Sequence, residues 1–156
     1  MQVSIVPVRA RLLALLIAFF ASAELFAQTP IRVATWNIQA VGAPGSAEYE
    51  AAVAVLVHLD ADILGVNEVS SAGDVANLEA LAADAGYDYV AAATSTPFGA
   101  QRNAVLSRFA FAEPVTEHDS STLSGDPSAN DITRRILEAR VEVPGNALDL
   151  TVVSQH

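Results

Sequence analysis

The segment DILGVNEV (residues 62–69) decides the fold that this sequence predicts. Its first half is an apolar run typical of a buried β-strand, and two polar residues, Asn67 and Glu68, follow it at once. A carboxylate that leaves the core at the end of a strand is either a ligand or a strand end that meets water. The segments around it have to distinguish these two interpretations.

Strands and helices alternate on both sides of this segment. IRVATWN (31–37) has the period-two alternation of a β-strand, and Ser46 is a suitable N-cap for the helix that follows. Two helices are predicted, at 47–62 and 74–86, with Gly86 as the stop of the second. The further strands are expected at 87–93, 103–108, 109–115, 134–143 and 147–156. The last two are expected to form a hairpin, so the pattern as a whole predicts a mixed-sheet α/β layer fold.

The composition is that of an acidic globular protein. The chain has 156 residues, 52% of them hydrophobic, which is enough for one domain with its own core. It has no cysteine, which excludes a disulfide framework. The formal net charge is −10 and all eight basic residues are arginine, so the surface repels polyanions in general. A phosphate substrate would therefore depend on a few local arginines and a divalent cation.

Residues 1–27 have the layout of a secretory signal peptide. Two arginines precede the apolar run LLALLIAFFASA, and small residues follow it. Cleavage after Ala27 is preferred to cleavage after Ala23, because Gln28 leads directly into the first strand. The apolar run is short for a membrane span, and an uncleaved anchor is the alternative. We therefore expect residues 28–156 to be secreted or periplasmic, with no integral membrane span.

Five segments carry a resemblance to a known family. They are TWNIQ, DILGVNEV, NAVLSR, the R-x-I-L-x-A-x-V pattern of RRILEARV, and a strand that ends in His156. In this order, over residues 31–156, the chain resembles the endonuclease/exonuclease/phosphatase family. This superfamily includes pancreatic-type deoxyribonucleases, abasic-site endonucleases, neutral sphingomyelinases and inositol-polyphosphate phosphatases. The resemblance implies a deoxyribonuclease-I-like fold, a layered β-sandwich flanked by helices, and a divalent-metal-dependent phosphoric ester hydrolase.

The resemblance also implies metal-site residues. Glu68 matches the family's metal-binding glutamate, and a carboxylate suits Mg²⁺ or Mn²⁺, which prefer oxygen ligands. Most members have Gln before this Glu, and the shorter amide of Asn67 should leave the metal function intact. Asn37 matches the family's asparagine after Trp, expected to support the metal-bound carboxylate or a neighbouring catalytic Asp by hydrogen bonds. A turn-forming Asn at a strand exit is the alternative, and Trp36 is expected in the core.

Two further matches concern the phosphate. His156 matches the histidine of a strand-ending T-H-x motif that bonds the scissile phosphate, and an imidazole can also protonate a leaving oxygen. Arg134 matches an arginine that contacts the phosphate, where a guanidinium engages two oxygens at once. Arg135 is adjacent and points the other way, so one of the two is structural and Arg134 is preferred. Arg102 and Arg108 are weaker candidates.

Other polar residues lie outside the pattern or depart from it. His58, on a predicted helix, and His118, in an acidic loop, are expected to be surface residues. STPFG (95–99) offers Thr96 where pancreatic-type nucleases pair a Glu with the catalytic His, which argues against a close pancreatic-nuclease mechanism. The family's later motifs, Gly-Asp-x-Asn and Ser-Asp-His, do not occur in the 156 residues. Because those motifs supply the groups that orient and activate water, we expect a truncated, N-terminal part of the domain that is inactive alone.

The expected substrate is a phosphate ester. Export argues against DNA repair and inositol signalling, which leaves an extracellular, nuclease-like phosphodiesterase as the first interpretation. A sphingomyelinase-like phospholipid phosphodiesterase is the second. An interpretation of another class is a non-catalytic, acidic exported module that binds a divalent cation or a partner surface.

Overall fold

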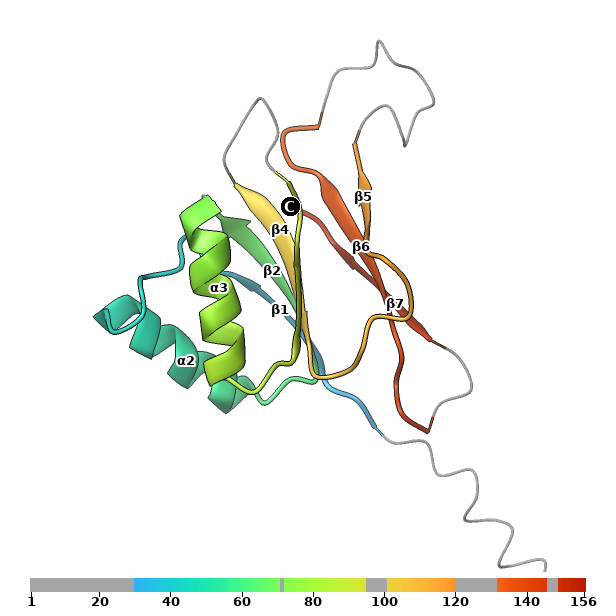
Figure 1. Cartoon of the computed structure of the whole chain (residues 1–156), viewed down its shortest axis with the longest axis horizontal. Helices are drawn as coiled ribbons and strands as arrows, with labels where there is room; N and C mark the ends of the chain where they lie inside the picture. The colour runs from blue at the N-terminus through green and yellow to red at the C-terminus, as the bar shows by residue number, and fades with distance from the viewer. Residues whose placement is uncertain (1–29, 71, 95–100, 120–131, 146–148) are drawn as a thin grey trace, which may run out of the picture.

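The computed structural model describes residues 30–70, 72–94, 101–119, 132–145 and 149–156. These segments form two β-sheets and two helices in layers (Figure 1). The expected signal peptide lies outside the described residues. Of the helices in the described part of the chain, none is long and apolar enough to cross a membrane.

The first sheet has four strands in the order β1-β2-β4-β3. They are β1 (Val33–Asn37), β2 (Ile63–Val69), β4 (Arg102–Ser107) and β3 (Tyr89–Ala92). β1 and β2 are parallel, whereas β4 is antiparallel to both of its neighbours. The apolar run of β2 is buried on both faces, which explains why the segment reads as continuously hydrophobic and not as alternating.

Both helices cover one face of this sheet. α2 (Ala47–Leu59) begins at Ser46, whose hydroxyl accepts the amide N–H of Tyr49 at 3.2 Å as predicted for an N-cap. The helix ends earlier than the expected 47–62, because Asp60 adopts a left-handed conformation with φ 46°. α3 (Ala72–Asp84) ends before Gly86, whose φ of 82° confirms the predicted stop.

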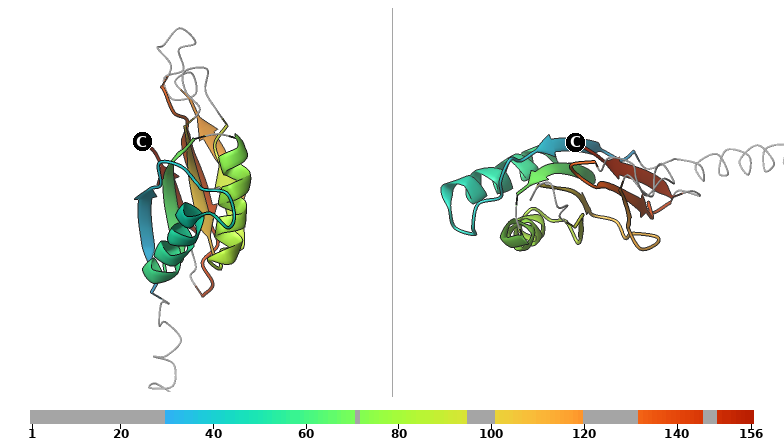
Figure 2. Two further views of the ribbon diagram at one scale, coloured as in Figure 1. Left: turned by 90° about the vertical axis from the view of Figure 1, so that its left-hand side faces the viewer. Right: turned by 90° about the horizontal axis from the view of Figure 1, so that it is seen from above.

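The second sheet packs on the opposite face of the first. Its strands are β5 (Thr116–His118), β6 (Ile136–Val141) and β7 (Leu150–Ser154), antiparallel in that order. One hydrophobic core lies between the helices and the first sheet, and another lies between the two sheets. Leu64 and Val66 of β2 face the first core, whereas Ile63 faces the second. The layers are visible in Figures 1 and 2, and they confirm the predicted α/β sandwich flanked by helices.

One predicted strand was wrong. Residues 109–115 form no strand apart from a single bridge between Phe111 and Val141. Pro114 has no amide N–H for a ladder, and the chain enters β5 only after it. The expected hairpin is confirmed, since β6 and β7 pair from Val141 and Leu150 outward. The tip of its turn lies outside the described residues.

Candidate active site

Glu68 sits at an irregular point near the end of β2. The register between β2 and β4 shifts between Val66 and Val69, which marks a β-bulge, and Glu68 has φ 64°. A left-handed conformation is uncommon for a residue with a side chain and is held in place only by surrounding structure. Bulges of this kind re-aim side chains next to functional sites. The carboxylate is mostly buried, with 16% of the side chain exposed.

The four residues predicted for the site lie together. Glu68 Oε1 is 3.5 Å from Arg134 Nη2 and 3.4 Å from His156 Nε2. His156 Nε2 is in turn 3.3 Å from Asn37 Nδ2. These residues come from the ends of β1, β2 and β7 and from the segment before β6. The structure thus brings these four residues together, while their assignment to a functional site and the role of each stay predictions.

The topology explains the convergence. β1 and β2 are parallel and in register, with Asn37 opposite Asn67, so both strands deliver polar residues to the same sheet end. β7 runs antiparallel to β6, so the end of β7 lies beside the start of β6. Figure 1 marks the C-terminus beside the first sheet, where β7 delivers His156.

His156 Nε2 has two neighbours with opposite requirements. The Asn37 carboxamide accepts the Gln39 amide N–H through Oδ1 at 3.1 Å, so its Nδ2 is the group turned to the imidazole. Nδ2 is a donor and needs a lone pair on Nε2, whereas the Glu68 carboxylate needs a proton there. The imidazole therefore satisfies only one of these contacts at a time. The Asn37 amide contacts His156 in this geometry, not the glutamate that it was expected to support.

The two adjacent arginines separate as expected. Arg134 Nη2 also contacts the Gln101 side-chain oxygen beside the site. Arg135 Nη1 instead pairs with Glu117 Oε2 at 3.1 Å, and the same carboxylate accepts hydrogen bonds from Thr94. Glu117 of β5 thus joins Arg135, which precedes β6, to Thr94, which follows β3, and Arg134 is the arginine of the cluster.

The two weaker arginine candidates differ in position. Arg108 pairs with Asp60 at 2.9 Å near the helix ends and lies outside the cluster. Its guanidinium also lies over the Tyr87 ring. The hydrogen bond from Arg108 is the main reason that the pKa of Asp60 is lowered. Arg102 begins β4, and its Nη1 is buried without a hydrogen-bond partner among the described residues.

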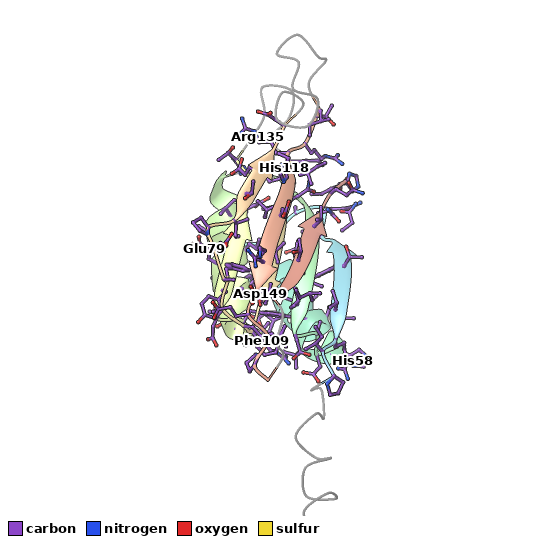
Figure 3. The ribbon with its side chains drawn as sticks, turned by 90° about the vertical axis from the view of Figure 1, so that its right-hand side faces the viewer. His58, Glu79, Phe109, His118, Arg135 and Asp149 are labelled. Carbon is purple, nitrogen blue, oxygen red and sulfur yellow. The ribbon has the colours of Figure 1, made fainter. Side chains whose placement is uncertain are left out.

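The two remaining histidines lie away from the cluster. His58 is exposed on α2, as expected. His118 is not in a loop, as the sequence suggested, but in β5, where Nε2 lies 2.8 Å from Glu138 Oε2. In Figure 3, His118 and Arg135 lie near one end of the second sheet, and His58 lies near the other end of the molecule.

Two buried side-chain amides, those of Asn67 and Asn103, lie behind the cluster, and the sequence alone did not predict that they are bonded to each other. Asn67 Nδ2 donates to Asn103 Oδ1 at 2.8 Å and to the Gln155 carbonyl at 3.0 Å. Asn103 Nδ2 donates to the Arg135 carbonyl at 2.8 Å. An Asn at the start of the apolar run NAVLS was the available signal for Asn103, because a buried polar side chain needs partners.

A shallow pocket of about 470 Å³ opens beside the cluster. It is lined by Ile132, Thr133, Arg134, Ile136, Gln155 and His156. The pocket contains two cluster residues that can donate hydrogen bonds and no carboxylate, so an anion can enter it.

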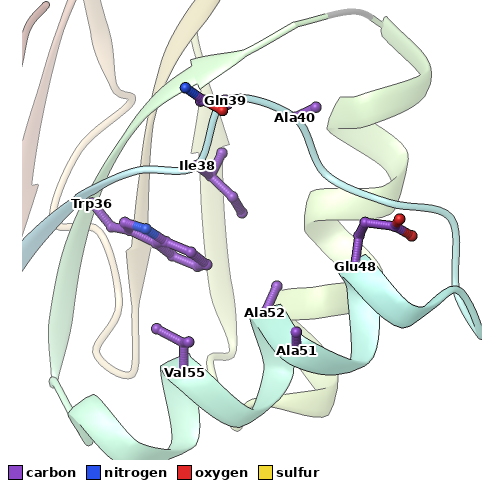
Figure 4. A pocket seen from close by; sticks show the side chains of 8 residues that line it. All are labelled: Trp36, Ile38, Gln39, Ala40, Glu48, Ala51, Ala52 and Val55. Atoms are coloured by element: carbon purple, nitrogen blue, oxygen red, sulfur yellow. The ribbon is translucent and has the colours of Figure 1, made fainter.

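A second pocket, of about 320 Å³, lies between β1 and α2. The Trp36 indole forms one wall and Val55 the facing one (Figure 4). Trp36 also packs against the first core while only partly buried, so its expected core role is confirmed and its outer face lines a surface groove.

The donor set can be compared with the expected cation. In the part of the chain that the structure describes, no three His, Cys, Asp or Glu residues cluster in a way that could hold a metal. Glu68 is the carboxylate of the site. Mg²⁺ is commonly bound through only one or two carboxylates and keeps several waters. A single Glu whose cation keeps several waters therefore fits Mg²⁺ or Mn²⁺ and not a four-ligand zinc site. The predicted second residue, Asn37, turns its side-chain oxygen to the Gln39 amide N–H.

Comparisons with known proteins show the family of the chain. The sequence model of the Endonuclease/Exonuclease/phosphatase family matches residues 34–148. Among solved structures, the crystal structure of an endonuclease/exonuclease/phosphatase from Beutenbergia cavernae DSM 12333 matches with a TM-score of 0.59 and 26% identity. The match covers 81% of this chain but only 38% of that one. No curated protein matches the chain.

Proposed function

The chain belongs to the endonuclease/exonuclease/phosphatase family of phosphoesterases, and from this premise we propose that it provides part of the active site of a divalent-metal-dependent phosphodiesterase. The observation that carries the proposal is the meeting of Glu68, Arg134 and His156 at one end of the sandwich. One carboxylate for a cation lies beside two groups that can bind a phosphate oxygen.

In this proposal each side chain has a distinct task. Glu68 holds Mg²⁺ or Mn²⁺, and the bound cation supplies Lewis-acid stabilisation of a phosphate oxygen. Arg134 binds the non-bridging oxygens and offsets the charge that develops on them. His156 donates a hydrogen bond to the phosphate through Nε2. Before phosphate binds, Asn37 orients the imidazole by donating from Nδ2 to the lone pair of Nε2, with its own carboxamide fixed by Gln39. When Nε2 is protonated, its hydrogen bond to the phosphate replaces this contact.

In this proposal, residues outside this chain orient and activate the attacking water. The 156 residues contain neither Gly-Asp-x-Asn nor Ser-Asp-His, and the chain spans 38% of the structurally similar protein. We therefore propose that the complete enzyme takes its water-orienting Asp and activating His from further sequence, and that this chain alone is inactive.

The substrate we propose is a nucleic-acid phosphodiester, hydrolysed outside the cytoplasm after signal cleavage. The signal-peptide layout of residues 1–27 supports export, and export argues against intracellular repair and signalling roles. With a net charge of −10, contact with a polyanion would be confined to the arginines at the site.

The test uses the full-length protein, by which we mean the complete enzyme and not the 156 residues alone. We expect Mg²⁺- or Mn²⁺-dependent cleavage of bis(p-nitrophenyl) phosphate and of plasmid DNA, abolished by a chelator. Sphingomyelin vesicles are the comparison substrate, and faster turnover of the lipid would replace the nucleic-acid assignment. His58→Ala is the control, because His58 is exposed on α2 and away from the cluster. Full-length protein without metal-dependent turnover on any of these substrates would overturn the proposal.

A further inference from the structure

The interior directly behind the site is polar, which is unusual for a sandwich core. Asn103 is 0% exposed and Asn67 is 7% exposed, and both point into the space between the two sheets' ends. The hydroxyl of buried Ser154 lies beside them and donates to the Val66 carbonyl at 3.3 Å. Polar groups at such positions cost free energy unless every one is paired.

The hydrogen bonds of this amide pair reach three segments that carry site residues. Asn67 immediately precedes Glu68 in β2. Its Nδ2 donates to the carbonyl of Gln155, the residue before His156. Asn103 Nδ2 donates to the carbonyl of Arg135, the residue after Arg134. The bond between the two amides closes the connection.

The direct contacts within the site are too long to fix this arrangement alone. Glu68 lies 3.5 Å from Arg134 and 3.4 Å from His156, at the outer limit for hydrogen bonds. The amide contacts behind them are 2.8–3.0 Å, and they are buried where hydrogen bonds are stronger and more cooperative. The backbone positions of the site are therefore held mainly by these buried amides, while the Arg134 side chain is also held by its contact with Gln101.

We propose that Asn67 and Asn103 are positioning residues that hold the backbones of Arg134 and His156 in register with Glu68. The inference rests on the proposed function, because it concerns the same site. A displacement of about 1 Å in a catalytic group can cost on the order of 10²-fold in rate. Loss of a supporting hydrogen bond around a metal site typically costs about 10- to 100-fold in affinity or activity.

The experiment compares variants of the full-length protein. Asn67→Leu keeps the branched shape and the number of side-chain heavy atoms but removes all amide hydrogen bonds. Asn67→Gln keeps a carboxamide but places it one methylene further from the backbone. Ser107→Ala is the matched control. Ser107 is equally buried and polar, but it lies at the opposite end of β4, and among the described residues its hydroxyl bonds only to Phe109.

We expect both Asn67→Leu and Ser107→Ala to lower the melting temperature. At a temperature where all variants are folded, Asn67→Leu should lose kcat by about 10- to 100-fold, with KM changed less, whereas Ser107→Ala should keep the wild-type kcat. Asn67→Gln should recover part of that loss. Titration with inorganic phosphate, without metal, should show weaker binding to Asn67→Leu than to Ser107→Ala.

Each outcome separates the two proposals. Wild-type protein without metal-dependent turnover contradicts the proposed function and leaves the phosphate titration to test the positioning role. Active wild-type protein whose Asn67→Leu variant matches Ser107→Ala in kcat and phosphate binding overturns the positioning role alone. If Asn67→Leu does not fold, Asn103→Ser replaces it in the experiment. A serine hydroxyl is too short to contact both Asn67 and the Arg135 carbonyl. A wild-type kcat in Asn103→Ser would overturn the inference in the same way.

Discussion

The left-handed backbone of Glu68 makes a prediction about stability that is independent of any catalytic assay. Glu68→Ala and Glu68→Gly both remove the carboxylate and its contacts with Arg134 and His156, so those losses cancel in the comparison. They differ in backbone strain, because alanine keeps the side-chain clash at φ 64° and glycine does not.

The magnitude follows from two opposing contributions. Relief of left-handed strain is worth about 1–2 kcal/mol per residue. The greater freedom of glycine in the unfolded chain costs about 0.4–1 kcal/mol. Glu68→Gly should therefore exceed Glu68→Ala in unfolding free energy by roughly 0.5–1 kcal/mol. For a chain of this size, this corresponds to a melting temperature about 1–4 °C higher.

The assay is thermal or urea unfolding followed by circular dichroism, with Thr35 as the control position. Thr35 is exposed in β1 and is not one of the positive-φ positions, so glycine there should be less stable than alanine by about 0.5–1 kcal/mol. The order of the two variants should thus reverse between the two positions. Equal stability of both Glu68 variants, or greater stability of the alanine variant, would show that Glu68 is not held in a strained conformation.

Four other predictions concern activity and pH. In the full-length protein, Glu68→Gln should lower turnover by at least ~10²-fold, with partial recovery in excess Mn²⁺; wild-type turnover would mean that the carboxylate is only a strand end. His156→Ala should reduce turnover while the Mn²⁺ affinity, measured by calorimetry, changes little. Purified 28–156 should not hydrolyse bis(p-nitrophenyl) phosphate above a chelator control. The hydrogen bond to Asp84 raises the pKa of Tyr49 from 10.0 to about 12. Since the unfolded chain releases this proton first, the contribution of Tyr49 to stability should be constant below pH 10 and be lost between pH 10 and 12. Tyr49→Phe should make that fall shallower in pH-dependent urea unfolding.

Much of the fold could be predicted from local pattern. The alternation in 31–37, the apolar run of β2 and the caps at Ser46 and Gly86 each reflect a physical requirement that acts within a few residues. The failed strand at 109–115 shows the limit of that approach, because its apolar residues pack against the second core without joining a ladder.

The candidate site, like the fold, could be predicted from the sequence only in part. The sequence by itself determined which residues were available, because Asn37, Glu68, Arg134 and His156 each stand at a strand end within a recognisable motif. The parallel pairing of β1 with β2 then brings Asn37 and Glu68 to the same end of the sheet.

Only the tertiary structure decided how those residues meet. The bulge that turns Glu68 inward depends on a register shift against β4, which no local pattern records. The choice of Arg134 over Arg135 depends on Glu117, and the amide pair of Asn67 and Asn103 depends on how the two sheets are placed together. These contacts join residues distant in sequence, and their geometry is set by packing between layers and not by the preferences of any single segment.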